Sequence, residues 1–176
     1  MSDAAGDPRV HPAGEPDAGP VDIVIEDERW LDAGLPALAA RAADAATDYL
    51  GIDQVEIVVM GCDDARIAAL NDHFRGKPKP TNVLSWPATE PAPRQPGDAP
   101  VPPQGPELGD IAISYDTCLR EAEAQGKPLN AHVTHLLVHA ILHLAGYDHE
   151  IDADAETMED AERSILGRLG IPDPYG

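Results

Sequence analysis

The chain is poor in basic residues, and this limits what it can bind. It has 12 Lys and Arg against 32 Asp and Glu, which gives a formal net charge of −20. Such a charge opposes any general attraction to nucleic acid, so a nucleic-acid substrate would need a locally basic path. Length is no such limit, because 176 residues with 43% hydrophobic content suffice for one domain with its own core.

Cysteines and long apolar runs are also scarce. Cys62 and Cys118 are neither closely spaced nor part of a cysteine-rich framework, which argues against a disulfide scaffold and favours a reducing compartment. Residues 1–20 lack the basic start and the apolar stretch of a signal peptide, and no apolar segment is long enough to span a bilayer. We therefore expect a cytoplasmic protein without a membrane partner.

The hydrophobic pattern predicts one α+β domain. Residues 1–20 are rich in Gly, Pro, Ala and Asp without hydrophobic periodicity, and we expect a disordered N-terminal tail there. The chain has no glycine-rich phosphate loop, and we predict a single small mixed β-sheet packed with about five helices rather than a doubly wound nucleotide fold. Within a single domain at 21–176, strands are predicted at 21–27, 55–61, 82–86 and 108–114, and helices at 29–50, 63–74, 115–125, 130–145 and 152–169.

Residues 87–107 interrupt this pattern. They contain eight prolines, the first at Pro87 and the last at Pro106. Proline has no backbone N–H to donate, so the segment should contain neither helix interior nor sheet. We predict an exposed Pro-rich insertion that is able to act as a mobile flap.

The run HAILHLAGYDH has the histidine spacing of a metal site. His139 and His143 are four residues apart, so one helix can point both rings at the same place. Gly146 can end that helix with a positive φ and turn the chain, so that His149 reaches the open side of the ion. Three neutral imidazoles leave one position for water, as in catalytic zinc sites. We therefore predict a zincin-like metal-binding helix with one Zn²⁺ per chain, while nickel and copper stay open alternatives.

Two further histidines share this helical face but do not fit the same ion. Histidines eight residues apart on a straight helix are separated by about 12 Å, whereas two nitrogens on one zinc are at most about 4 Å apart. His135 therefore cannot join His139 and His143 as a third ligand. We expect His132 and His135 to line the cleft, in hydrogen bonds or in contact with substrate.

One segment carries a local excess of positive charge. No acidic residue occurs from His73 to Thr89, and Arg75, Lys77 and Lys79 fall inside this stretch. The segment alone leaves two interpretations open, a path for phosphate groups or a solvated turn stiffened by proline.

The segments NDHFRGKPKPTNVLSWP, LGDIAIS and HAILHLAGYDH, in this order, resemble the YbeY family of bacterial single-strand-specific endoribonucleases. The resemblance covers roughly residues 21–174, and the ending GIPDPY is also similar to that of the family. It implies a zinc-dependent enzyme that acts in 3′-end maturation of 16S rRNA and in ribosome quality control. It also implies partners on the ribosome or among small-subunit assembly factors.

Position by position, the resemblance assigns the metal ligands to His139, His143 and His149 and the functionally important arginine to Arg75. Arg75 would then stabilise charge on the scissile phosphate, because a planar guanidinium forms paired hydrogen bonds to phosphate oxygens. The expected substrate is single-stranded RNA, and no cleavage of DNA is expected.

Other positions carry weaker expectations. Lys77 and Lys79 would position the RNA backbone, and His135 would contact the substrate. The chain departs from the family pattern at Asn82, where aspartate is common. Asn82 lacks the charge of aspartate, which puts in doubt any acid or base role at this position.

Two alternatives remain. The same histidine spacing occurs in metzincin peptidases, but those enzymes need a glutamate directly after the first histidine, and Ala140 has no proton-accepting group. The chain could also be a non-catalytic, metal-stabilised ribosome assembly factor. The open fourth coordination position argues against that alternative, because structural zinc sites are usually closed by a fourth protein ligand.

Overall fold

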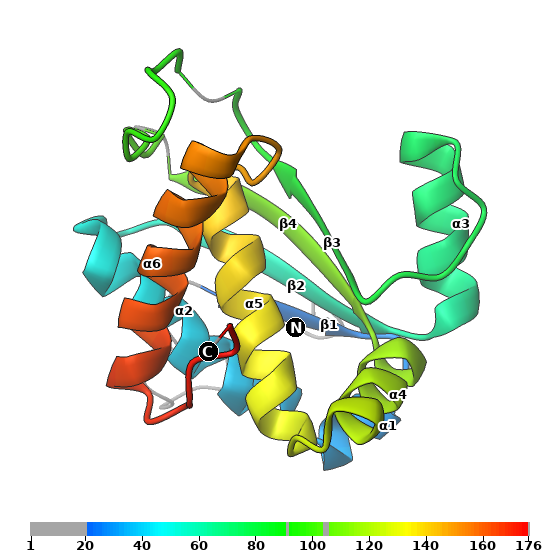
Figure 1. Ribbon diagram of the computed structural model, residues 1–176. Coiled ribbons are helices and arrows are strands. Elements are labelled where there is room, and N and C mark those ends of the chain that lie inside the picture. Colours follow the sequence, from blue (N-terminus) through cyan, green and yellow to red (C-terminus); the bar gives the residue numbers. More distant parts are fainter. Residues whose placement is uncertain (1–20, 91, 104–105, 176) are drawn as a thin grey trace.

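The computed structural model describes residues 21–90, 92–103 and 106–175, so the tail predicted at residues 1–20 lies outside it. In these ranges the fold consists of one mixed four-stranded sheet and six helices (Figure 1). In chain order the elements are β1 (Val21–Ile25), α1 (Arg29–Asp32), α2 (Leu35–Leu50), β2 (Glu56–Cys62), α3 (Asp64–Arg75), β3 (Val83–Pro87), β4 (Glu107–Ser114), α4 (Tyr115–Gln125), α5 (Leu129–Leu144) and α6 (Asp152–Arg168).

The sheet has the strand order β1-β2-β4-β3. β1, β2 and β4 are parallel, whereas β3 is antiparallel to β4 and forms one edge. Side chains alternate between the two faces of a strand, and each face has its own core. The larger core includes Ile57 and Ile111 and packs against α2, α5 and α6. The smaller core, next to α3, consists of Cys62, Ile67, Leu84 and Ala112.

The predicted α+β class with a single mixed sheet is confirmed, but two details differ. The helix predicted at 29–50 is two helices, because Gly34 adopts a φ of 78° between α1 and α2 and breaks the helical geometry. The expectation of no sheet at 87–107 is wrong at both ends, since Pro87 closes β3 and Glu107 opens β4. Proline is tolerated there because β3 is an edge strand.

The helix α5 is apolar on nearly all sides and occupies the centre of the larger core. Leu137, Ile141 and Leu144 are almost completely buried. Neighbours of α5 are α2, α4, α6 and the strands β3 and β4. His135, His139 and His143 are only partly buried and mark the face of α5 that the core does not fill, whereas His132 is buried. No helix in the described ranges is long and apolar enough to cross a membrane.

Close packing of α5 on the sheet depends on Gly109 in β4. This residue has a φ of 149°. A Cβ atom at Gly109 would collide with the backbone carbonyl oxygen of Trp86 and would lie 2.7 Å from Leu144 Cδ2. The absence of a side chain thus allows β3, β4 and the end of α5 to approach one another.

The Pro-rich insertion is mostly exposed in its described residues, and it is attached to the start of α6. Gly97 donates its backbone N–H to Asp154 Oδ1 over 2.8 Å, and Arg94 lies 3.5 Å from Asp154 Oδ2. The hydroxyl of Thr157 donates to the carbonyl of Gly97 over 2.6 Å. The predicted exposure is confirmed, and movement of the insertion as a flap stays a prediction.

Candidate functional site

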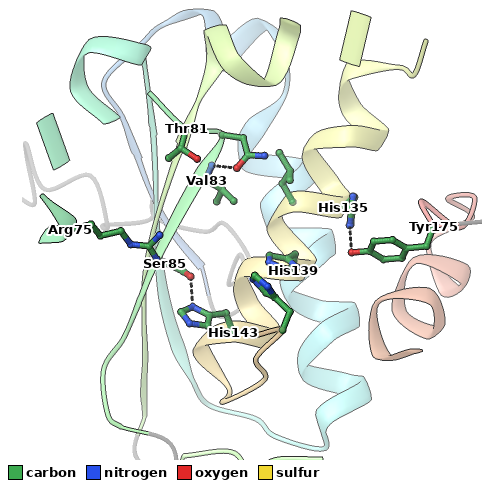
Figure 2. Close-up of a pocket in the computed structure, with 11 residues that line it drawn as sticks. Arg75, Thr81, Val83, Ser85, His135, His139, His143 and Tyr175 are labelled. Atoms are coloured by element: carbon green, nitrogen blue, oxygen red, sulfur yellow. Dashed lines mark hydrogen bonds between the residues drawn. The ribbon is translucent and has the colours of Figure 1, made fainter. Parts of the chain in front are cut away.

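A cavity of about 380 Å³ lies between β3, the end of α3 and the histidine face of α5. Figure 2 shows Arg75 reaching in beside Ser85 and His143, while Tyr175 approaches His135 from the other side. These side chains come from segments far apart in the sequence, so the cavity depends on the complete fold. The lining residues are Arg75, Thr81, Asn82, Val83, Ser85, His135, Leu136, His139, His143, His149 and Tyr175.

The three histidines predicted to bind metal all line this cavity. His139 and His143 lie one turn apart on the same face of α5. Directly after the helix, Gly146 adopts a φ of 107°, which confirms the predicted turn. The turn brings His149 back toward the helix, with its ring centroid 5.2 Å from that of His139. The structure thus gathers the three rings, and metal binding by them stays a prediction.

Both predicted metal ligands on α5, His139 and His143, already have a partner at Nδ1. His139 Nδ1 lies 2.8 Å from Glu162 Oε2, and His143 Nδ1 lies 2.5 Å from Ser85 Oγ. Metal-binding histidines usually hold such a partner at one ring nitrogen and offer the other nitrogen to the metal. The Nε2 atoms of both rings are therefore the ones left to serve as ligands.

The surroundings of His143 favour its neutral form. Burial lowers the pKa of this imidazole, and the charges of His139 and Arg75 lower it further. Asp148 acts in the opposite direction. A neutral imidazole is the form that binds metal, so this environment is compatible with the predicted ligand role of His143.

The donor set fits zinc better than calcium or magnesium, because it consists of imidazoles and not of carboxylates. Within the described ranges, no group of three or more His, Cys, Asp or Glu side chains meets the geometry of a metal site. The structure thus shows three imidazoles that line one cavity, and their binding of a zinc ion stays a prediction.

Arg75 is the last residue of α3, and its exposed side chain lines the cavity. Lys77 and Lys79 follow in the exposed loop before β3 and are not part of the cavity wall. Asn71 fixes this loop, since its Nδ2 donates to the carbonyl of Lys79 over 3.0 Å. The structure thus places Arg75 in the same cavity as the histidines and the two lysines outside it, and substrate contact by Lys77 and Lys79 stays a prediction.

His135 lines the cavity, but its Nε2 is already engaged. It lies 2.8 Å from Glu162 Oε1, and the hydroxyl of Tyr175 donates to the same oxygen over 2.7 Å. Sequence reasoning missed both partners. A signal for Glu162 existed, because it lies four residues after Met158 and three before Ile165 on the apolar stripe of α6, where a carboxylate needs buried partners.

Asn82 forms two hydrogen bonds, and an ionised aspartate could form only the one that Oδ1 accepts, because it has no N–H to donate. Its Nδ2 donates to Glu121 Oε1 over 3.1 Å, and its Oδ1 accepts from the backbone N–H of Val83 over 2.6 Å. The same Glu121 oxygen lies 2.9 Å from His132 Nε2. An aspartate at position 82 would place a second negative charge beside Glu121, so the amide suits this neighbourhood.

Comparison with known proteins is consistent along nearly the whole chain. A family model described as "Endoribonuclease YbeY" matches residues 23–170. A relative named "Endoribonuclease YbeY" from Paracoccus denitrificans is 76% identical over 155 residues, which cover 88% of this chain and 89% of the relative. A relative of the same name from Cereibacter sphaeroides is 58% identical over 163 residues, covering 88% of this chain and 98% of the relative.

One solved structure supports the fold. The solution structure of TM1509 from Thermotoga maritima superimposes with a TM-score of 0.53 at 22% identity, covering 89% of this chain and 99% of that protein. At this identity the likeness concerns the fold alone. The family match and the identities to the two relatives go further, and they show that the chain belongs to the YbeY family.

Proposed function

We propose that the protein is a zinc-dependent endoribonuclease that cuts single-stranded RNA. The observation that carries this proposal is the cavity in which His139, His143 and His149 lie together with Arg75. The name "Endoribonuclease YbeY" of the family model and of close relatives supports RNA as the substrate. The three histidines are the proposed ligands of one zinc ion.

The chain itself prepares two of these ligands. Ser85 and Glu162 hold the Nδ1 atoms of His143 and His139, so both rings can present Nε2 to the cavity. His149 is exposed, and its backbone N–H donates to Asp148 Oδ1 over 2.7 Å, which fixes the turn that carries it. When bound by these residues, a zinc ion would supply Lewis-acid chemistry at a phosphate oxygen or a water molecule.

Arg75 supplies the positive charge that the reaction needs. A guanidinium can form two parallel hydrogen bonds to phosphate and can stabilise the extra charge of a pentacoordinate transition state. Lys77 and Lys79 lie outside the cavity, on the loop that connects Arg75 at the end of α3 to β3, where they would hold the RNA backbone. Together the three cations would provide the locally basic path that a chain of net charge −20 needs.

The biological assignment extends this proposal. We place the enzyme in the cytoplasm, in 3′-end maturation of 16S rRNA and in ribosome quality control, with ribosomal or small-subunit assembly partners. The resemblance to the YbeY family supports this placement. We further propose that residues 21–176 work as a single domain.

A cleavage assay on protein of known metal content tests the proposal. Wild type, His143→Ala and Arg75→Ala would be incubated with a single-stranded RNA, its duplex and the DNA of the same sequence. Arg41→Ala is the matched control, because Arg41 is an exposed arginine on α2 outside the cavity. We expect about one zinc per chain in wild type, loss of single-strand cleavage in both site variants, and normal zinc content in Arg75→Ala. The loss for Arg75→Ala should be roughly 100- to 1000-fold, as for other charge-stabilising groups.

The outcome also separates the alternatives. Tight zinc binding without any RNA cleavage would favour the non-catalytic assembly factor. Cleavage of a peptide substrate would favour the metallopeptidase, although Ala140 offers no general base. The product ends identify the nucleophile, because a 2′,3′-cyclic phosphate requires attack by the ribose hydroxyl, and DNA would then be left intact.

A further inference from the structure

Glu162 is a carboxylate in the core between α5 and α6. Its relative exposure is 0%, and its neighbours on the apolar stripe of α6 include Met158 and Ile165. A buried carboxylate is costly unless each oxygen is paired, and a position on this stripe would ordinarily favour an apolar residue. A specific role must therefore compensate for its burial.

All three partners of Glu162 reach it through proton-bearing atoms. Oε1 lies 2.8 Å from His135 Nε2 and accepts from the Tyr175 hydroxyl over 2.7 Å, while Oε2 lies 2.8 Å from His139 Nδ1. Three donors converge on two oxygens, and an ionised carboxylate, which only accepts hydrogen bonds, satisfies all three of them. In this arrangement His139 carries its proton on Nδ1, the atom that faces Glu162 Oε2.

We propose that Glu162 is the positioning residue of the metal site, which holds His139 in the Nδ1-protonated tautomer so that Nε2 faces the cavity. This inference rests on the proposed function, because it takes His139 to be a metal ligand. Glu162 acts through His139 and does not itself touch metal or substrate. Without it the neutral imidazole could place its proton on Nε2, and that tautomer cannot bind a metal through Nε2.

The C-terminal segment completes this arrangement. Tyr175 donates to Glu162, and its ring meets that of His135 edge to face at 5.7 Å. Asp173 fixes the segment to α6, because its Oδ2 accepts from Arg163 Nε over 2.9 Å and its Oδ1 accepts from the backbone N–H of Tyr175 over 2.8 Å. The segment that carries Asp173 and Tyr175 thus covers the Glu162 carboxylate, and we expect metal affinity to depend on Tyr175.

Zinc affinity, measured by competition with a chromophoric chelator, tests the proposal without reference to catalysis. Glu162→Gln keeps the size of the side chain but has only one acceptor oxygen for three donors, and we expect zinc binding to weaken roughly 10- to 100-fold. Tyr175→Phe removes one of the three hydrogen bonds and should cause a smaller loss. Glu156→Gln is the control, because Glu156 is an exposed carboxylate of the same helix. Its affinity should equal that of wild type.

The tautomer of His139 gives a second readout that a merely structural role would not predict. Long-range ¹H–¹⁵N correlation spectra of metal-free protein at pH 8 should show the proton on Nδ1 in wild type and a mixture of tautomers in Glu162→Gln. A proton on Nε2 in wild type would overturn the proposal even if the variant failed to fold. Unchanged zinc affinity in a folded Glu162→Gln would also overturn it.

These outcomes are independent of RNA cleavage. If wild type binds zinc through His139 but cuts no RNA, the proposed function fails and the role of Glu162 stands. If His139→Ala binds zinc as tightly as wild type, His139 is not a ligand, and the role of Glu162 falls with that assignment.

Discussion

Replacement of Gly109 by alanine should damage both the fold and the site, because this glycine lies where β3, β4 and α5 meet. An added Cβ would collide with the carbonyl oxygen of Trp86 and would lie 2.7 Å from Leu144 Cδ2. Trp86 directly follows Ser85, and Leu144 directly follows His143. A shift that relieves the collision must move β3 or the end of α5 away from β4, and unequal movement of the two would disturb the hydrogen bond between Ser85 and His143.

The expected size follows from two separate costs. The φ of 149° at Gly109 is strained for any other residue, at about 1–3 kcal/mol. Forcing an extra methyl into a packed core costs about 1–3 kcal/mol more. The free energy of unfolding should fall by about 2–6 kcal/mol, which is a large part of the total for an ordinary domain.

Gly126→Ala is the matched control, because Gly126 also has a positive φ, of 64°, but no atom lies within 4 Å of the Cβ that alanine would add. This variant should lose only the backbone cost of roughly 1–2 kcal/mol. Urea unfolding of the metal-free proteins, followed by circular dichroism, measures the free energy of unfolding of wild type and of both variants. Equal losses in the two variants would refute the packing argument, as would a Gly109→Ala protein that binds zinc as tightly as wild type.

Three further predictions concern charge and the insertion. Lys77→Ala and Lys79→Ala should each weaken RNA binding, leave kcat unchanged and reduce the slope of log affinity against log salt by about 0.7 for a single strand, as measured by fluorescence titration. Asp154→Ala removes the acceptor for Gly97, so limited proteolysis within residues 92–103 should become faster than in wild type. In metal-free protein, the lowered pKa of Glu162 should add roughly 3 kcal/mol to the free energy of unfolding. This stabilisation is fully present above the unfolded pKa of 4.5 and is lost as the pH falls toward the folded pKa of about 2. Urea unfolding of wild type and Glu162→Gln should therefore give curves that converge on acidification, and a constant separation would contradict the prediction.

The secondary structure could be predicted because its signals are local. Alternating apolar residues predict the four strands, and the start of the helix predicted at 63–74 agrees with α3, where the side chain of Asp63 accepts from the backbone N–H of Arg66. The break at Gly34 was missed because a single glycine inside an Ala- and Leu-rich pattern is compatible with a helix. The strand order β1-β2-β4-β3 depends on pairing between distant segments, and local hydrophobic patterns do not contain that information.

Parts of the site followed from spacing, and parts did not. The gathering of His139, His143 and His149 follows from one helix and one glycine turn. The prediction that Arg75 acts together with these rings depended only on the resemblance to the YbeY family. Glu162 and Ser85 could not be assigned as partners of the histidines, because α6 and β3 meet α5 only through packing of the core.

The local charge at the cavity differs from that of the whole chain, and the packing around α5 explains how. Among the described residues that line the cavity none is acidic, although the chain carries 32 Asp and Glu. Two carboxylates beside the histidines of α5 are already paired: Glu121 of α4 with His132, and Glu162 of α6 with His135 and His139. These carboxylates orient imidazole rings through hydrogen bonds and do not line the cavity, whereas the side chain of Arg75 does. A strongly acidic protein can in this way present a neutral-to-positive surface to a phosphate group at the one place where the proposed reaction requires it.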